Sequence, residues 1–199
     1  MPSTRRRFLT SSLIMGTSIQ SVRAKAAPGE PLIVSTWPFG KAGNDKALDT
    51  LKHKGSLLDA VEQGIRVVES DEKNRSVGIT GLPNAAGVVQ QDACIMNGSD
   101  HNAGSVAAIE GILHPITAAR RVMEKTPHAM FAGQGAHRVA KSFGISLVEP
   151  RSLVTSAAVE EWKEYKQYNR TVGELCCSKD DALCHDTVGA CAMVRAGVC

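Results

Sequence analysis

Aromatic residues are scarce in this chain of 199 residues, which has only two Trp, two Tyr and four Phe. No stretch interleaves these aromatics with basic residues, and the formal net charge is a modest +3. Proteins that bind nucleic acid present a basic surface, and those that bind single strands add aromatic side chains on which bases stack. The composition therefore argues against nucleic acid as a partner.

The chain also lacks the usual signatures of a membrane span and of a metal site. The uncharged run from Leu9 through Val22 is too short and too polar to cross a bilayer. No cysteine forms a Cys-x-x-Cys pair, and His185 has no second His or acidic residue at ligand spacing, so we predict no metal and no cofactor. The sequence leaves open whether the late cysteines pair as disulfides or stay free thiols. These are Cys176, Cys177, Cys184, Cys191 and Cys199.

The N-terminus has the pattern of an export signal. Three arginines at 5–7 precede Phe8-Leu9 and the uncharged run, and a small-x-small cleavage pattern follows at 24–27. Paired arginines before Phe-Leu resemble the twin-arginine type of signal; the alternative is a disordered basic tail. We expect residues 1–26 to be removed and the mature protein to be periplasmic or extracellular, without a membrane contact once the signal is gone.

Strands and helices alternate along the rest of the chain without a regular βαβ rhythm. Ser56 followed by Asp59 has the spacing of a capping box and predicts a helix start there. We expect strands at 32–37, 76–80, 128–132 and 187–194, a hairpin-like pair within 87–96, and helices at 42–69 (broken at Gly55), 116–125, 134–143 and 157–168. This order predicts one layered α/β (α+β) domain that starts near Pro31, with a largely antiparallel sheet under helices.

The hexamer Cys184-His185-Asp186-Thr187-Val188-Gly189 is the most suggestive short motif near the carboxyl end. Taken alone, a polar-to-apolar switch of this kind usually marks only the entry of a strand. Its meaning depends on the motifs upstream. In chain order these are Val34–Phe39, Leu58–Glu62, Ser76–Gly78 with Gly81–Pro83, Asp92–Met96, Gly104–Ala107, His114–Ile116, Ala118–Arg120 and Val122–His128.

Together with the hexamer, these motifs resemble the glycosylasparaginases, a family of N-terminal nucleophile amidohydrolases within the type 2 asparaginase superfamily. The resemblance runs from about Leu32 to Met193 and implies an αββα sandwich. It implies a precursor that cuts itself between Asp186 and Thr187, leaving Thr187 as the N-terminal nucleophile, while His185 orients the cleaved loop. The implied reaction hydrolyses N4-(β-N-acetylglucosaminyl)-L-asparagine to aspartate and the aminosugar, and the implied assembly is an α/β heterodimer or a dimer of these.

The local chemistry agrees with this role for Thr187. A hydroxyl is a weak nucleophile and needs a base beside it. Cleavage would expose the α-amine of Thr187, and such amines have a pKa of about 7.7–8.0, so the nucleophile would carry its own base. Asp186 offers a carboxylate close to the bond that is cut. No catalytic His or metal is then required.

Two further residues have both a structural and a functional interpretation. Trp37 is either a core aromatic at the end of a strand or, as the resemblance implies, a residue that packs near the substrate. Ser76 is either a plain strand-entry residue or a hydrogen-bonding group near the nucleophile. The resemblance favours a small substrate of the glycosylasparagine or asparagine type, bound by Trp37 and Ser76.

The end of the chain departs from the family. Residues 31–186 correspond to the first subunit and 187–199 only to the first strand of the second, whose oxyanion donors and substrate clamps have no counterpart here. We expect a fragment of a longer precursor or a natural truncation, inactive as an isolated chain. The alternatives are an L-asparaginase or isoaspartyl peptidase of the same superfamily, and a non-catalytic truncated remnant.

Overall fold

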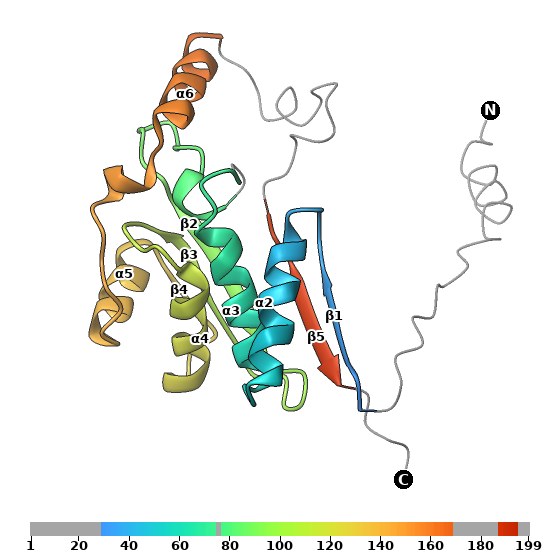
Figure 1. Cartoon of the computed structure of the whole chain (residues 1–199). Helices are drawn as coiled ribbons and strands as arrows, with labels where there is room; N and C mark the ends of the chain where they lie inside the picture. Colours follow the sequence, from blue (N-terminus) through green and yellow to red (C-terminus); the bar gives the residue numbers. More distant parts are fainter. Residues whose placement is uncertain (1–28, 75–76, 169–186, 195–199) are drawn as a thin grey trace, which may run out of the picture.

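The computed structural model of the chain describes residues 29–74, 77–168 and 187–194, and Figure 1 shows their arrangement. The described strands are β1 (Pro31–Ser35), β2 (Gln91–Met96), β3 (Ala103–Ile109), β4 (Met130–Ala132) and β5 (Ala190–Val194). They form two sheets, an antiparallel β1-β5 pair and a three-stranded sheet in the order β2-β3-β4. β2 and β3 run antiparallel, whereas β3 and β4 run parallel. The second sheet is therefore mixed.

Helices pack against both sheets, which confirms the prediction of a layered α/β fold. They are α2 (Gly40–Lys52), α3 (Leu57–Glu69), α4 (Pro115–Lys125), α5 (Gly133–Ser142) and α6 (Ser156–Tyr168), with short 3-10 turns at η1 (Gly78–Thr80) and η2 (Pro150–Leu153). α2 contacts β1, α3 contacts β5, and α4 and α5 contact β3. α6 projects from the top of the molecule in Figure 1.

Local sequence chemistry fixes the start and the packing of α3. The hydroxyl of Ser56 accepts the backbone N–H of Asp59 at 3.1 Å, and the Asp59 carboxylate accepts the N–H of Ser56 at 2.8 Å. This is the predicted capping box, and the structure confirms it. Gly43 and Gly64 then let α2 and α3 approach closely, because a Cβ on either glycine would lie within 3 Å of the other's carbonyl oxygen.

Two expected strands are wrong. In the segment expected as a strand at 76–80, the described residues form a 3-10 turn, because Gly78 adopts a left-handed conformation with φ +78° that a strand does not allow. The expected pair within 87–96 contains only β2, whose partner is β3. A turn precedes β2, because the side chain of Asn84 accepts two backbone N–H groups, one of them from Val88 at 3.2 Å.

The main core lies where α4 covers the β2-β3 pair, with α3 packed between α4 and β5. Its buried apolar residues include Ile65, Ile95, Val106, Ile109, Ile112, Ile116, Val122 and Met123. Val188 and Ala190 pack against this cluster from the side of β5. The core therefore anchors the segment that carries Thr187, even though the two sheets are not paired with each other.

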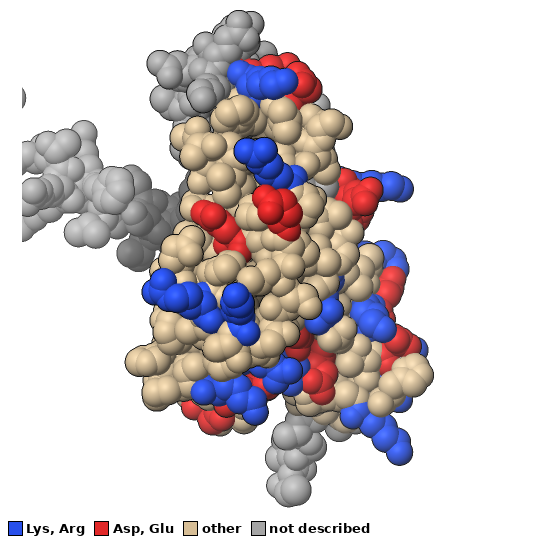
Figure 2. All heavy atoms as spheres, turned by 90° about the vertical axis from the view of Figure 1, so that its left-hand side faces the viewer, with Lys and Arg blue, Asp and Glu red and all other residues tan. Residues whose placement is uncertain are grey.

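The charged surface shows no field of one sign on the face drawn in Figure 2. Lys and Arg side chains alternate with Asp and Glu over this face, with uncharged areas between them. Within the described ranges, no helix is long and apolar enough to span a membrane.

Candidate active site

The backbone of residues 187–189 is held at the end of β1. The N–H of Thr36 donates to the carbonyl of Gly189 at 2.9 Å, and the N–H of Gly189 donates to the Thr36 hydroxyl at 2.9 Å. These bonds extend the β1-β5 ladder by one step beyond the pairing of Ser35 with Ala190. Thr187 follows at the outer end of this ladder and is exposed. The ladder thus fixes the position of the predicted nucleophile relative to the first strand.

Trp37 connects β1 directly to Thr187. Its indole Nε1 donates to the Thr187 carbonyl at 3.2 Å, and the side chain is 47% exposed. Trp37 therefore does not act as a core aromatic. Its φ of +63° lies in the left-handed region, which costs a non-glycine residue about 1–2 kcal/mol. Strain of this kind clusters at functional sites, where the surrounding structure holds it in place.

Residues 187–190 form one wall of a cavity of about 720 Å³, which we call the Thr187 cavity. The other walls come from α3, the start of η1, β2, β3 and the start of α4. Apolar side chains dominate this lining, including Val61, Ile65, Val89, Ile116 and Val188. A largely apolar cavity with few polar groups is the usual form of a small-molecule site.

Glu69 is the buried acidic group of this lining. Only 3% of the residue is exposed. Its Oε1 accepts the backbone N–H of Ile116 at 3.1 Å, and its Oε2 lies 3.1 Å from Nδ1 of His114. Burial raises the pKa of Glu69, while the bonds to His114 and Ile116 oppose that change only in part.

Gln91 and Asp92 bring polar groups to the cavity from the start of β2. Gln91 is 7% exposed, and neither its amide nitrogen nor its amide oxygen has a hydrogen-bond partner within the described part of the chain. Asp92 lies at an irregularity in the β2-β3 register, where its carboxylate accepts the N–H of Ala108 at 2.7 Å. Ala108 has a left-handed φ of +47°, so Asp92 supports a bulge in the wall of the cavity.

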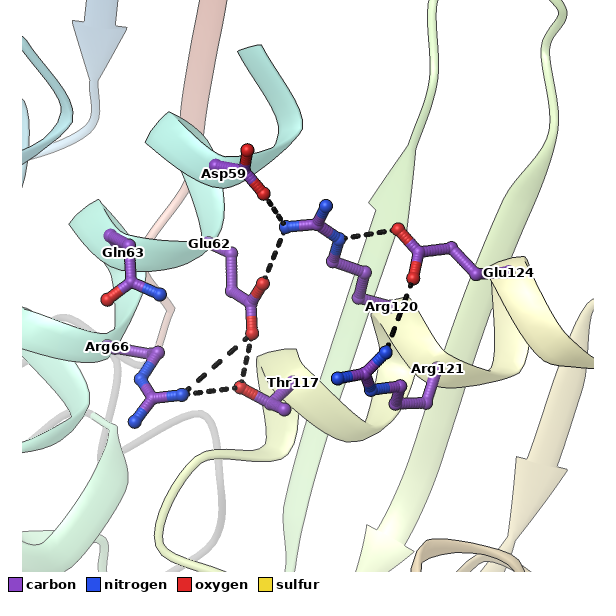
Figure 3. Close-up of a pocket in the computed structure, with 8 residues that line it drawn as sticks. All are labelled: Asp59, Glu62, Gln63, Arg66, Thr117, Arg120, Arg121 and Glu124. Carbon is purple, nitrogen blue, oxygen red and sulfur yellow. Dashed lines mark hydrogen bonds and ion pairs between the residues drawn. The ribbon is translucent and has the colours of Figure 1, made fainter. Parts of the chain in front are cut away.

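A second, smaller pocket lies between α3 and α4 and is lined entirely by polar side chains (Figure 3). We call its residues the α3–α4 ion cluster. They are Asp59, Glu62, Gln63, Arg66, Thr117, Arg120, Arg121 and Glu124, around a volume of about 280 Å³. Its acidic and basic groups are equal in number, so the cluster carries no net charge.

Arg120 is the centre of the ion cluster. Its guanidinium lies 2.7 Å from carboxylate oxygens of Asp59, Glu62 and Glu124. Burial opposes the charge of Arg120, but the hydrogen bonds to these three carboxylates outweigh it and raise the pKa of the guanidinium. The bonds from Ser56 and then from Arg120 lower the pKa of Asp59. Every strong charge here has a partner, so the cluster is a structural clamp between two helices.

The structure brings together two of the predicted site residues, Thr187 and Trp37. His185, Asp186 and Ser76 lie outside the described residues. Among the described residues, no group of three or more His, Cys, Asp or Glu side chains is arranged to hold a metal. Cys94 and Cys191 are exposed free thiols, and the remaining cysteines lie outside the described ranges.

Sequence reasoning missed the polar lining of the cavity. The sequence predicts Glu69 only as the end of a helix, and its position beside His114 depends on how α3 and α4 pack. Asp92 has a signal in the sequence, because it begins one of the motifs that carry the family resemblance. Gln91 had a weaker signal, as a polar residue at the start of an apolar strand.

Comparisons with known proteins agree on one family. A family model described as asparaginase matches residues 11–198. An N(4)-(beta-N-acetylglucosaminyl)-L-asparaginase of Elizabethkingia miricola is 43% identical over 171 residues, covering 84% of this chain and 47% of that protein. A plant-type L-asparaginase of Pyrococcus horikoshii is 40% identical over 147 residues, covering 70% of this chain and 47% of that protein. An isoaspartyl peptidase/L-asparaginase of Rattus norvegicus is 32% identical over 196 residues, covering 97% of this chain and 55% of that protein. The chain thus spans about half the length of these relatives.

Proposed function

The chain belongs to the asparaginase family, and from that premise we propose that the intact protein is an amidohydrolase that cleaves N4-(β-N-acetylglucosaminyl)-L-asparagine. The products are aspartate and the aminosugar. The observation that carries the proposal is the placement of Thr187 at the wall of a large, mainly apolar cavity, with its carbonyl bonded to the strained Trp37. A hydroxyl nucleophile needs a fixed backbone to aim it, and this contact supplies one.

In this proposal Thr187 acts twice. Its hydroxyl first attacks the carbonyl carbon of Asp186, and the peptide C–N bond breaks as the ester forms, which frees the α-amine of Thr187. Water then hydrolyses this ester, which leaves a carboxylate on Asp186 and restores the Thr187 hydroxyl. That amine then takes the hydroxyl proton when Thr187 attacks the side-chain amide carbonyl of the substrate. The leaving amine departs with a proton, and water hydrolyses the acyl-enzyme to release aspartate. His185 orients the cleaved loop, and Ser76 hydrogen-bonds near the nucleophile.

Trp37 has a defined part in both steps. Its indole N–H holds the Thr187 carbonyl, so the Cα of Thr187 is fixed on one side while the peptide bond on the other side is cut. The β-branched side chain of threonine then leaves few χ1 rotamers for the hydroxyl. Together, these restraints keep the nucleophile pointed in one direction without a further side chain.

The substrate preference rests on similarity together with two motifs. The glycosylasparaginase relative is 43% identical, and the family resemblance favours that branch at Ser-Thr-Trp-Pro-Phe (35–39) and at His-Asp-Thr (185–187). A second candidate is an L-asparaginase or isoaspartyl peptidase, because relatives with those names match at 40% and 32% identity. Both candidates use the same nucleophile and differ in what leaves the aspartyl group.

Aspartate release by the intact protein separates these candidates. Three substrates are compared at equal concentration: N4-(β-N-acetylglucosaminyl)-L-asparagine, a β-aspartyl dipeptide and L-asparagine. We expect the highest kcat/KM for the glycosylated substrate and none above background for Thr187→Ala. A higher value for the dipeptide or for asparagine would assign the protein to the second candidate. Activity that survives Thr187→Ala would remove the proposed nucleophile.

We further propose that the protein is exported and works as an α/β heterodimer or a dimer of these. Residues 1–26 act as the export signal, which a fractionation of cells that express the intact protein tests directly. The isolated chain of residues 1–199 is expected to release no aspartate, because the relatives it matches are about twice as long. Detectable release by that chain would contradict this part of the proposal.

A further inference from the structure

Helix α3 carries two buried glutamates, Glu62 and Glu69, seven positions apart along one face. Both are less than a tenth exposed, and both form hydrogen bonds to α4. Two residues of one type, on one helix and at similar depth, make a natural pair for comparison. They differ in which pocket they line, because Glu62 belongs to the ion cluster and Glu69 to the Thr187 cavity.

Glu62 is surrounded by partners that neutralise it. Arg120 lies 2.7 Å from its Oε2, Thr117 donates its hydroxyl to Oε1, and Arg66 lies 4.0 Å from the same oxygen (Figure 3). A carboxylate held this way is a structural group.

Glu69 has no bonded guanidinium among the described residues. Its two oxygens are taken by one backbone N–H, that of Ile116, and by one imidazole nitrogen, that of His114. Ile116 lies in the first turn of α4, whose N-cap residue His114 makes no side-chain cap bond. Glu69 therefore caps α4 from another helix, at the helix end where a negative charge is favourable. With both oxygens engaged, it is placed to hold structure rather than to attack a substrate.

The main chain of Glu69 also contacts a turn in the cavity wall. Gly78 lies directly against the backbone of Glu69, so closely that a Cβ at position 78 would overlap the Glu69 carbonyl. Val77 and Gly78 line the Thr187 cavity, and so does Ile116. One residue at the end of α3 is thus in contact with two separate wall segments, the turn at 77–78 and the start of α4.

We propose that the Glu69 side chain is a positioning group for the reaction at Thr187: it fixes the start of α4, a wall of the cavity that Thr187 also lines. The inference rests on the proposed function and deepens it, since it names a residue that acts on that site without touching the substrate. Glu62 serves as the matched control, because it has the same side chain and burial but lines the other pocket.

The test compares Glu69→Gln, Glu69→Ala and Glu62→Gln in the intact protein. Glu69→Gln keeps an oxygen for the Ile116 N–H and loses only the charge beside His114, so kcat should fall about tenfold with KM almost unchanged. Glu69→Ala removes the cap as well and should lower kcat about a hundredfold. Glu62→Gln should lower stability while kcat per folded molecule stays within about twofold. Equal loss of kcat in Glu69→Gln and Glu62→Gln would overturn the inference.

Amide hydrogen exchange on the same proteins separates this inference from the proposed function. Exchange at residues 116–118 and 187–189 should speed up in both Glu69 variants and stay at the wild-type rate in Glu62→Gln. If the wild type releases no aspartate, the proposed function fails, and this exchange pattern alone decides whether Glu69 positions the cavity wall. Unchanged exchange at 187–189 in Glu69→Gln and Glu69→Ala would overturn the positioning role, whatever the activity.

Discussion

The two pockets of this molecule differ in how their charges are balanced. The α3–α4 ion cluster contains six charged side chains, yet each strong charge is bonded to an opposite one. The Thr187 cavity is larger and mainly apolar, and its buried polar groups are Glu69 and Gln91. Glu69 has a raised pKa, and the Gln91 amide has no partner within the described residues.

The difference shows that density of charged residues is a poor guide to function in this fold. A compensated cluster gains little from a ligand, because its hydrogen bonds are already made. A polar group buried without full compensation costs free energy, and that cost is accepted where the group holds a site in shape. The ion cluster holds two helices together, and the cavity is where chemistry is expected.

Breaking the ion cluster should give the largest loss of stability. Arg120→Met leaves Glu62 and Asp59 without their main cation, so the free energy of unfolding should fall by about 3 kcal/mol. Urea unfolding of the intact protein measures this. Arg121→Met is the matched control, because Arg121 is 47% exposed and lies 3.7 Å from Glu124, and it should cost less than about 0.5 kcal/mol. Similar losses in the two variants would contradict a central role for Arg120.

Removing one hydrogen bond from the cavity side should affect the reaction more than the fold. Trp37→Phe keeps an aromatic ring and loses the indole donor to the Thr187 carbonyl, so self-cleavage should slow about tenfold. Trp162→Phe removes a similar indole bond, to the carbonyl of Asn84 at 2.8 Å, away from Thr187. Gel analysis of processing over time compares the two. An equal slowing in both variants would show that the bond to Thr187 has no special role.

The capping box tests the helix that both pockets share. Ser56→Ala removes the acceptor for the N–H of Asp59 and should cost about 1 kcal/mol in thermal unfolding, with cleavage at Thr187 unchanged. Ser142→Ala, at an exposed serine near the end of α5, should cost less than about 0.5 kcal/mol. If Ser56→Ala folds fully but is no longer cleaved at Thr187, the N-terminus of α3 would also affect the site, which contradicts this prediction.

The smallest effect concerns the pH dependence of stability. Burial raises the pKa of Glu69 above its ordinary value of 4.5, so the native state binds the proton more tightly than the unfolded state. The contribution of Glu69 is fully present below pH 4.5 and is lost as the pH rises through the raised pKa. Relative to wild type, Glu69→Gln should therefore gain stability as the pH increases above 4.5.

Chemical unfolding between pH 4 and pH 6, a window of about two pH units around the ordinary pKa, measures this difference. His114 and Arg66 both act on the Glu69 carboxylate, so the series is repeated in a His114→Asn background, which removes the imidazole beside Glu69. A stability difference that shrinks as the pH increases would mean that the pKa of Glu69 is lowered instead.

The sequence predicted the elements whose signals are local. The capping box of Ser56 and Asp59 depends on residues close together in the chain, and the structure confirms it. The expected strand at 76–80 was wrong, because its β-branched residues favour a strand while the left-handed Gly78 depends on packing against Glu69. Local propensity does not contain that contact.

The residues of the candidate site also fall into those that motifs predict and those that depend on packing. Thr187 and Trp37 were predicted from motifs, and the structure places them in contact across 150 positions of sequence. Glu69 and Gln91 were missed, because their burial in the wall of the Thr187 cavity depends on which elements pack against them. Asp59 and Glu62 lie in one motif of the family resemblance and Arg120 in another, and the ion pairs that join them depend on how α3 packs against α4.

The mass of the purified intact protein tests the central claim most directly, because only a working Thr187 centre cuts the chain in front of Thr187. Mass spectrometry and N-terminal sequencing are applied to the wild type and to Thr187→Ala. The account predicts a fragment that begins at Thr187 in the wild type and an uncut chain in the variant. A wild-type protein that stays whole, or a variant that is cut at the same bond, would contradict it.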